Sequence, residues 1–302
     1  MHKHNVGRLT GFTLQARSVK PSDAVYNVSM SCLSDAWLTE VARRREAAVQ
    51  WAREAGRLTL QWFQRPDLDV VRKADASPVT EADRQAEQWL RDRIARQFPG
   101  DAVLGEEHGE EPGRSGFRWV LDPIDGTKSF IFGVPLYTTL VGIEFEQTSV
   151  VGVIHAPALD ETVHAAVGAG CVYEHGTASR PARVSRRSLS DGLFVTSQVD
   201  SFDRRKARAL FDQLAERAYV TRTWGDAYGY LLVATGRAEL MIDPVMHLWD
   251  AAAILPVLEE AGGRFTDWQG RRSTSSGEGI GSNGLVHAEV LQLTEPFAKP
   301  AE

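Results

Sequence analysis

The sequence of 302 residues predicts an α/β protein, and three observations support that prediction. Two segments in the first hundred residues repeat apolar side chains at helical spacing. Short apolar runs with short connections follow them, which favours a mainly antiparallel sheet with helices on it. The last third alternates strand and helix patterns, as α/β folds do. We therefore expect an N-terminal α+β half at 36–185 and a C-terminal α/β half at 186–302.

Composition narrows the class of protein. Hydrophobic residues make up 43% of the chain and charged residues 25%, values typical of globular proteins. The net charge of −6, without a long basic run, argues against a nucleic-acid partner. No apolar stretch reaches the length of a membrane span. Cys32 and Cys171 have neither metal-ligand spacing nor the pattern of a disulfide framework. We expect a cytoplasmic protein with no membrane partner.

The first 35 residues differ from the rest. They lack a clear helical period, and basic residues outnumber acidic ones there. A targeting peptide can have this composition. We interpret residues 1–35 instead as a disordered N-terminal extension, in which Met30 is a plausible internal start.

The elements of the first half follow from periodicity. Apolar residues recur at helical spacing from Trp37 to Trp62, which predicts a helix over 36–63 that Ser34 or Asp35 can cap. A second helix is expected over 80–98. The predicted strands are 103–104, 117–121, 137–145, 149–155 and 161–166.

A glycine-rich and basic stretch at 168–190 separates this half from the alternating pattern of the second. Gly236 and Gly262 are well placed to end helices. Pro256 lies inside the last predicted helix and should kink it or mark where it packs. The predicted strands are 193–196, 219–222, 238–242 and 264–267, and the predicted helices are 203–216, 226–235 and 249–261.

The most informative motif is Asp-Pro-Ile-Asp-Gly-Thr-Lys at 122–128, directly after the predicted strand 117–121. Pro123 stiffens the turn, and Gly126 lets the backbone approach a ligand. Two carboxylates at such a turn are good ligands for hard cations. If the following residues begin a helix, their N–H groups can face a phosphate. The motif therefore indicates metal-assisted phosphoryl chemistry.

Three other acidic motifs are Thr80-x-x-Asp83, Gly105-Glu106-Glu107 and Trp249-Asp250. Each has a simpler interpretation, since Asp83 can complete a capping box, Asp250 can favour a helix N-terminus, and Glu106 can lie in a solvated turn. Together with the 122–128 motif, however, they lie at the ends of predicted elements, where ligand sites gather. Such a set of oxygen ligands is expected to bind two cations, with Mg²⁺ the first choice. No His/Cys cluster favours zinc.

These four motifs, in this order, resemble the inositol monophosphatase family of Mg²⁺-dependent phosphatases, and the resemblance covers residues 36–295. It implies an inositol monophosphatase-like layered α/β sandwich with alternating helix and sheet layers. It also implies two or three Mg²⁺ ions per site, with Mn²⁺ as a substitute, and a homodimer by analogy. The metal ligands implied are Glu106, Asp122, the carbonyl of Ile124, Asp125 and Asp250. The catalytic residues implied are Asp83, Glu106 and Thr127, with the Thr127 hydroxyl coupled to Asp83 to orient a metal-activated water.

The substrate is expected to be a small phosphorylated metabolite. The segments 125–130, 222–239 and 267–270 resemble the histidinol-phosphatase branch of the family, which implies hydrolysis of histidinol phosphate in histidine biosynthesis. Carboxylates near the leaving group would attract its ammonium and imidazole. Asp226 can instead cap the helix 226–235, and Arg222 can reach the phosphate or form a surface salt bridge. The substrate-binding residues expected are Asp125, Gly126, Thr127, Lys128, Arg222, Asp226, Asp243 and Asp250.

Other functions remain open at this point. The leading alternative is an inositol-1-phosphate or broad sugar-phosphate phosphatase. A different class is an inactive sensor of phosphorylated ligands on the same fold, but such a protein should have lost at least one metal-binding acid. The motif acids are all present. The histidines are left without a role, because the metal mechanism needs none.

Overall fold

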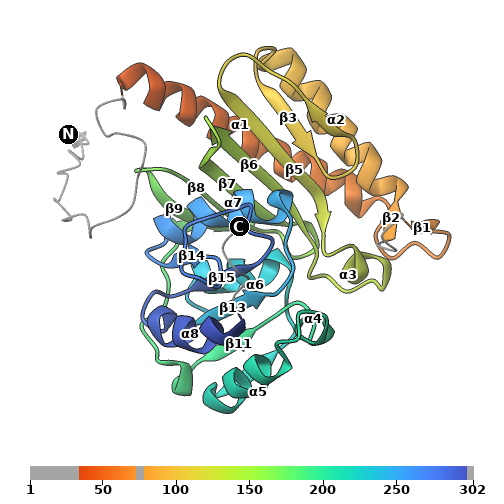
Figure 1. Ribbon diagram of the computed structural model, residues 1–302. Coiled ribbons are helices and arrows are strands. Elements are labelled where there is room, and N and C mark those ends of the chain that lie inside the picture. The colour runs from red at the N-terminus through yellow and green to blue at the C-terminus, as the bar shows by residue number, and fades with distance from the viewer. Residues whose placement is uncertain (1–33, 73–77, 298–302) are drawn as a thin grey trace, which may run out of the picture. The chain divides into compact units, whose positions relative to one another are not determined.

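The computed structural model describes residues 34–72 and 78–297, whose course Figure 1 traces. The predicted extension at 1–35 lies outside the described residues except for its last two. The chain divides into two units after Leu38, and the fold described below is that of the second unit, from Thr39 onward. The division of the chain near residue 185 stays a prediction. None of the described helices combines the length and apolarity that a bilayer crossing requires.

The first sheet has eight strands in the order β10-β9-β8-β7-β6-β5-β3-β4. All neighbouring strands are antiparallel except β3 and β5, which confirms the prediction of a mainly antiparallel sheet. The strands are β3 (Ala102–Gly105), β4 (Gly109–Glu111), β5 (Phe117–Asp125), β6 (Thr138–Phe145), β7 (Thr148–Ala156), β8 (Glu161–Ala166), β9 (Gly170–His175) and β10 (Ala178–Pro181).

Helices α1 (Asp35–Leu60) and α2 (Glu81–Gln97) begin and end close to the predicted positions. Trp51 of α1 packs on Trp119 of β5 and on Phe98, which follows α2, with ring centroids 5.4 and 5.9 Å apart. The two helices therefore share one aromatic core with the sheet. A short antiparallel pair, β1 (Val70–Arg72) and β2 (Pro78–Thr80), leads into α2.

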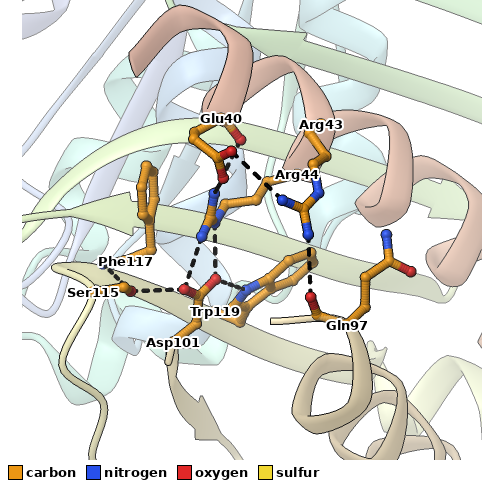
Figure 2. Close-up of polar contacts among 8 residues, drawn as sticks. All are labelled: Glu40, Arg43, Arg44, Gln97, Asp101, Ser115, Phe117 and Trp119. Atoms are coloured by element: carbon orange, nitrogen blue, oxygen red, sulfur yellow. Dashed lines mark hydrogen bonds and ion pairs between the residues drawn. The ribbon is translucent and has the colours of Figure 1, made fainter. Parts of the chain in front are cut away.

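A buried ion pair ties α1 to the loop between α2 and β3 (Figure 2). The guanidinium of Arg44 donates to both carboxylate oxygens of Asp101, at 2.8 and 2.9 Å. Trp119 Nε1 and Ser115 Oγ also donate to Asp101, at 2.8 and 2.6 Å. Because Asp101 thus has four donors, burying its charge is compensated by hydrogen bonds.

The second sheet has five strands in the order β12-β11-β13-β15-β14. Strands β12, β11 and β13 are parallel, and β15 is antiparallel to both of its neighbours. The strands are β11 (Leu193–Val195), β12 (Val220–Arg222), β13 (Leu240–Asp243), β14 (Arg264–Thr266) and β15 (Gly279–Ser282), and the helices are α4 (Asp200–Arg204), α5 (Arg208–Arg217), α6 (Ala227–Ala234), α7 (Leu248–Glu260) and α8 (His287–Thr294).

Helices α6 and α7 lie between the two sheets. Their apolar residues form one core with Leu140 and Ile154 of the first sheet and Met241 of the second. A separate core on the outer face of the second sheet includes Phe194 and Leu210. The second unit is therefore a sandwich of alternating helix and sheet layers, which confirms the predicted fold class (Figure 1).

Close packing explains elements that the sequence pattern missed. Strand β15 reads Gly-Ile-Gly-Ser, and a Cβ on Gly281 would lie 2.5 Å from the ring of Tyr230. A strand built from small residues has no apolar alternation to recognise. Strands β9 and β10 are mostly half-buried or exposed, and their polar residues gave no signal either. The predicted helix 203–216 is divided into α4 and α5, with Lys206 at a φ of 58° between them.

Candidate active site

The site begins at the end of β5, which continues through the Asp-Pro-Ile-Asp motif instead of ending at residue 121. The register against β6 shifts between Asp122 and Asp125, because Pro123 cannot donate to the ladder. The hydroxyl of Thr139 donates to the Pro123 carbonyl at 2.8 Å. The N–H of Ile124 donates to Asp122 Oδ1 at 3.1 Å. This bulge directs both carboxylates to the same end of the strand.

Asp250 reaches the same place from the first turn of α7. Its carboxylate accepts a hydrogen bond from the N–H of His247 at 2.7 Å and completes a capping box. Asp250 thus also lies at a helix N-terminus, as the simpler interpretation predicted. Asp122, Asp125 and Asp250 each offer a carboxylate oxygen within 4.8 Å of the other two. The structure therefore brings together three of the predicted metal ligands.

Asp83 and Glu106 lie beside this group. Asp83 Oδ2 accepts from the N–H and the hydroxyl of Thr80, at 2.8 and 2.6 Å, which completes the capping box of α2. Glu106 follows β3, and its N–H donates to Leu121 O at 3.2 Å. That bond places Glu106 next to Asp122. Electrostatic repulsion from Glu106 adds to the effect of burial in raising the pKa of both Asp83 and Asp122.

The short helix α3 (Thr127–Ile131) begins where the sequence indicated, with Gly126 at a φ of 81°. Only glycine adopts this backbone conformation without strain. The hydroxyl of Thr127 donates to the carbonyl of Ile124 at 3.1 Å. Because the hydrogen bonds of Thr127 and Asp83 go to other groups in the described chain, their coupling stays a prediction.

Asp226 and Asp243 come from the second sheet and its connections. Ser197 Oγ donates to Asp243 Oδ1 at 2.6 Å and accepts from the N–H of Asp226 at 3.2 Å. Asp226 precedes α6, but its side chain makes no cap hydrogen bond. Asp125 Oδ2 accepts the Ala227 N–H instead, at 2.7 Å. The interpretation that the Asp226 side chain caps the helix is therefore wrong: Asp226 stands at the N-cap position, but the carboxylate that accepts the first helical N–H is that of Asp125.

The backbone of Asp226 is also unusual, with a φ of 38°. A Cβ added to Gly126 would lie 2.8 Å from Asp226 Oδ2, so the carboxylate lies directly against the metal-motif loop. Strained residues of this kind gather at ligand sites. The observation is consistent with a role for Asp226 at the site.

Lys128 and Arg222 lie at the edge of the site, and both are exposed. Lys128 Nζ donates to Gln198 Oε1 at 2.8 Å. Burial raises the pKa of Asp226 above its usual value, and the Ser197 hydrogen bond and the positive charge of Lys128 offset only part of that rise. Arg222 donates to the Thr221 carbonyl, and its guanidinium carbon lies 5.8 Å from the ring centre of Trp224. Among the described residues no ion pair joins Arg222 to an acid, so the surface salt bridge of the alternative interpretation is not formed.

Burial and mutual repulsion raise the pKa values of the acids. The pKa of Asp122 and that of Asp125 lie well above the usual range, first because both are buried and then because of neighbouring carboxylates. Burial raises the pKa of Asp250 to about 8, and those of Asp83 and Asp243 to about 7. Clustered carboxylates with raised pKa values are costly unless a cation compensates them.

The residues fit a hard divalent cation. The donor set of the trio Asp122, Asp125 and Asp250 consists of carboxylate oxygens, and these described acids supply neither sulfur nor imidazole nitrogen. The three acids come from β5 and from the first turn of α7, and the packing of these elements brings the carboxylates together. Cation binding would therefore relieve repulsion that the fold already imposes.

Several residues that position the site were not predicted. Thr138 and Ser197 bind Asp125 and Asp243 through hydroxyl groups, and Glu87 binds the turn after Glu106. Isolated threonines and serines carry no sequence signal. Glu87 follows Asp83 by one helical turn, and that spacing on α2 was the available clue.

Carboxylates from both sheets and from the buried helix α7 meet at one site of a layered α/β fold. This combination of fold and site defines a class of metal-dependent phosphate-ester hydrolases. Residues 40–297 match the model of the inositol monophosphatase family, and the chain belongs to that family. The histidinol-phosphatase of Chlorobaculum parvum is 44% identical over 78% of this chain and 90% of its own length. That of Mycobacterium tuberculosis is 37% identical over 81% and 95%. The solved structure of the Thermotoga maritima IMPase is 30% identical and covers 84% of this chain and 98% of its own, with a TM-score of 0.76.

Proposed function

We propose that the protein is a Mg²⁺-dependent phosphatase that hydrolyses histidinol phosphate to histidinol and phosphate. The observation that carries the proposal is the trio Asp122, Asp125 and Asp250. Two further acids, Asp226 and Asp243, lie next to this trio. The similarity to two histidinol-phosphatases supports the choice of substrate.

The proposed ligands of the cations are Glu106, Asp122, the carbonyl of Ile124, Asp125 and Asp250. When bound, Mg²⁺ would supply Lewis acidity, which lowers the pKa of a nearby water and offsets the charge of the phosphate. The protein's own part is to hold the ligands in place. The N–H of Ile124 orients Asp122, the Thr138 hydroxyl orients Asp125, and the His247 N–H orients Asp250.

The remaining groups act on the water and the phosphate. Thr127 is proposed to orient the attacking water through its hydroxyl, with Asp83 as the neighbouring proton acceptor. The pKa of Asp83, about 7, suits a group that takes up a proton near neutral pH. The N–H groups of Gly126 and Thr127 are proposed to hold the phosphate oxygens where charge increases in the transition state. Lys128 is proposed to add positive charge at the edge of the site.

Selectivity is proposed to come from the leaving-group side. Asp226 and Asp243 are linked through Ser197, and together they present negative charge that an ammonium or imidazolium would satisfy. An inositol leaving group has only hydroxyls and would gain less. Arg222 is proposed to reach the substrate phosphate after leaving the Trp224 ring.

One experiment tests the substrate assignment. Phosphate release would be measured with histidinol phosphate, inositol 1-phosphate, fructose 1,6-bisphosphate and a 3′-phosphonucleotide. We expect the highest kcat/KM with histidinol phosphate. Equal or faster hydrolysis of inositol 1-phosphate would move the assignment to an inositol or sugar-phosphate phosphatase, the alternative that the likeness to the Thermotoga maritima IMPase favours. No hydrolysis of any ester would favour the inactive sensor.

The variant Asp226→Asn tests the selectivity mechanism, because it removes the charge while keeping the shape. A charge-assisted hydrogen bond is worth about 1.5–3 kcal/mol, so the preference for histidinol phosphate should fall about tenfold to a hundredfold. Asp203→Asn is the control, since Asp203 is an exposed surface acid paired with Arg208. An unchanged preference in the Asp226 variant would remove this residue from the substrate contacts.

The assembly and location are proposed on analogy alone. A homodimer is expected from the family, and light scattering at micromolar concentration would measure it. A cytoplasmic location would be checked by cell fractionation.

A further inference from the structure

Glu87 is a buried carboxylate that the mechanism above does not use. It lies on α2 with no exposed surface, one helical turn after Asp83. A buried carboxylate is costly unless it is paired and hydrogen-bonded. Its partners therefore indicate what the burial of Glu87 achieves.

Two of its partners are Glu107 and His108, the residues that follow Glu106. Glu87 Oε2 accepts the N–H of Glu107 at 2.8 Å, and Oε1 accepts the N–H of His108 at 3.1 Å. Nδ1 of His108 lies 3.2 Å from the same Oε1. Two neighbouring backbone amides of the turn are thus bound to one carboxylate, which restricts the conformation of the turn.

Gly105, on the other side of Glu106, lies equally close. A Cβ at Gly105 would lie 2.1 Å from Glu87 Oε1, so only glycine leaves room for the carboxylate. The N–H of Glu106 itself is bound to Leu121 O of β5 at 3.2 Å. Glu106 is therefore held by β5 on one side and by Glu87 on the other.

Arg91 extends this support by one more turn of α2. Its Nε donates to Glu87 Oε1 at 2.8 Å, and its Nη2 donates to the carbonyl of Gly109, where β4 begins. The positive charge of Arg91 balances that of Glu87, so the pair adds no net negative charge to the acid cluster. Helix α2 thus binds the turn at Glu107, His108 and Gly109.

From these contacts we propose that Glu87 is a positioning residue for Glu106, one that sets the affinity of the site for a divalent cation. The inference rests on the proposed function, in which Glu106 is a metal ligand. Groups that orient metal ligands change metal affinity about tenfold to a hundredfold when they are replaced. Helix α2 would then serve the site twice, through Asp83 at its start and through Glu87 one turn later.

The test is direct binding of Mn²⁺, followed by electron paramagnetic resonance, in wild type and in Glu87→Gln. Glutamine has one acceptor oxygen, so one N–H of the turn would face an amide NH₂ group and the turn must move. We expect the Kd for Mn²⁺ to rise at least tenfold. The Mg²⁺ concentration for half-maximal turnover should rise in parallel, while kcat at saturating Mg²⁺ stays within about threefold, because the ligands themselves are retained.

Glu239→Gln is the matched control. Glu239 is also fully buried, is paired with Arg187, and accepts a backbone N–H, that of Leu193. It lies in the second half, away from the turn that carries Glu106. This variant should lose stability but retain the wild-type Kd for Mn²⁺, which separates loss of a buried carboxylate from loss of ligand positioning.

If Glu87→Gln does not fold, the Kd for Mn²⁺ is measured in Glu87→Asp instead. Aspartate keeps the negative charge, but its side chain is one methylene shorter, so the carboxylate lies farther from the turn. A folded Glu87 variant with the wild-type Kd for Mn²⁺ would overturn the inference while leaving the proposed function intact. Failure of both variants to fold would also overturn it, since Glu87 would then serve stability alone. A wild-type protein that binds no Mn²⁺ would overturn the proposed function and the inference with it.

Discussion

Asp125 joins the two halves of the protein at the scale of a single residue. Its Oδ2 accepts the Thr138 hydroxyl of β6 at 2.8 Å and the Ala227 N–H of α6 at 2.7 Å. Asp125 also offers a carboxylate oxygen to the acid cluster with Asp122 and Asp250. One side chain therefore binds the first N–H of α6 and also contributes to the candidate metal site.

The variant Asp125→Asn should separate these two roles. An amide oxygen can still accept both hydrogen bonds, so the helix start is kept, whereas the charge needed for a cation is lost. We expect turnover to fall by at least a hundredfold, with metal-free stability equal to that of wild type or higher, because repulsion within the cluster decreases. Phosphate release and thermal melting in chelator would measure the two effects. An active variant would exclude Asp125 as a ligand.

At the scale of elements, the position of Asp250 depends on how closely α7 approaches the first sheet. Cβ atoms on Gly142 of β6 and Gly152 of β7 would lie 2.8 Å from Ala252 Cβ and 2.0 Å from Ala253 O. Pro256 packs on the same Gly152, so it marks the packing surface, as one of the two predictions for it stated. The glycines therefore let the helix lie directly on the strands.

Gly152→Ala tests that arrangement. The added methyl has no space, so α7 must shift and carry Asp250 with it. We expect a loss of about 1–3 kcal/mol in the free energy of unfolding and weaker metal activation. Gly100→Ala is the control, because its nearest contact would be Ser115 Cβ at 3.7 Å, an ordinary distance. Equal behaviour of the two variants would contradict the role of the glycines.

Elements whose apolar residues repeat at regular spacing were predictable from the sequence. Elements that depend on contacts between residues distant in the sequence were not. Helices α1, α2 and α7 and strands β6 to β8 follow from apolar spacing, and the site acids follow from motifs at element ends. The continuation of β5 through Pro123 depends on a bulge against β6, which only the paired strand reveals. The support that Glu87 gives to the Glu106 turn depends on a contact between residues twenty apart. Short-range patterns do not contain such information.

At the scale of the whole molecule, buried histidines and buried acids respond to pH in opposite directions. Burial lowers the pKa of His287 to about 4, and its ring nitrogens contact the hydroxyls of Thr266 and Ser282 at 3.0 and 2.9 Å. A neutral ring satisfies both contacts by donating to one hydroxyl and accepting from the other. The acids, whose pKa values are raised, instead favour the folded state at lower pH.

His287→Gln should isolate the histidine contribution. The unfolded chain binds a proton to His287 below its usual pKa of 6.5, whereas the folded protein does so only below about 4. The free energy of unfolding therefore decreases as pH falls through that window. Between pH 7 and pH 5 this amounts to about 2 kcal/mol. Urea titrations at both pH values should show wild type losing about that much more stability than the variant. An equal loss would show that His287 is protonated in the fold.

Metal removal acts on the whole molecule, because the acid cluster joins elements of both sheets. We expect exhaustive chelation to abolish phosphate release and Mg²⁺ or Mn²⁺ to restore it. A ligand at a thousand times its Kd stabilises the folded state by about 4 kcal/mol. Saturating Mg²⁺ should therefore raise the melting temperature of wild type, and Asp250→Asn should lose most of that rise. Asp203→Asn, which changes only a surface acid, should keep it. Undiminished turnover in chelator would contradict the metal mechanism. If Mg²⁺ does not change the melting temperature, the acid cluster is stable without a cation, although its acids repel one another.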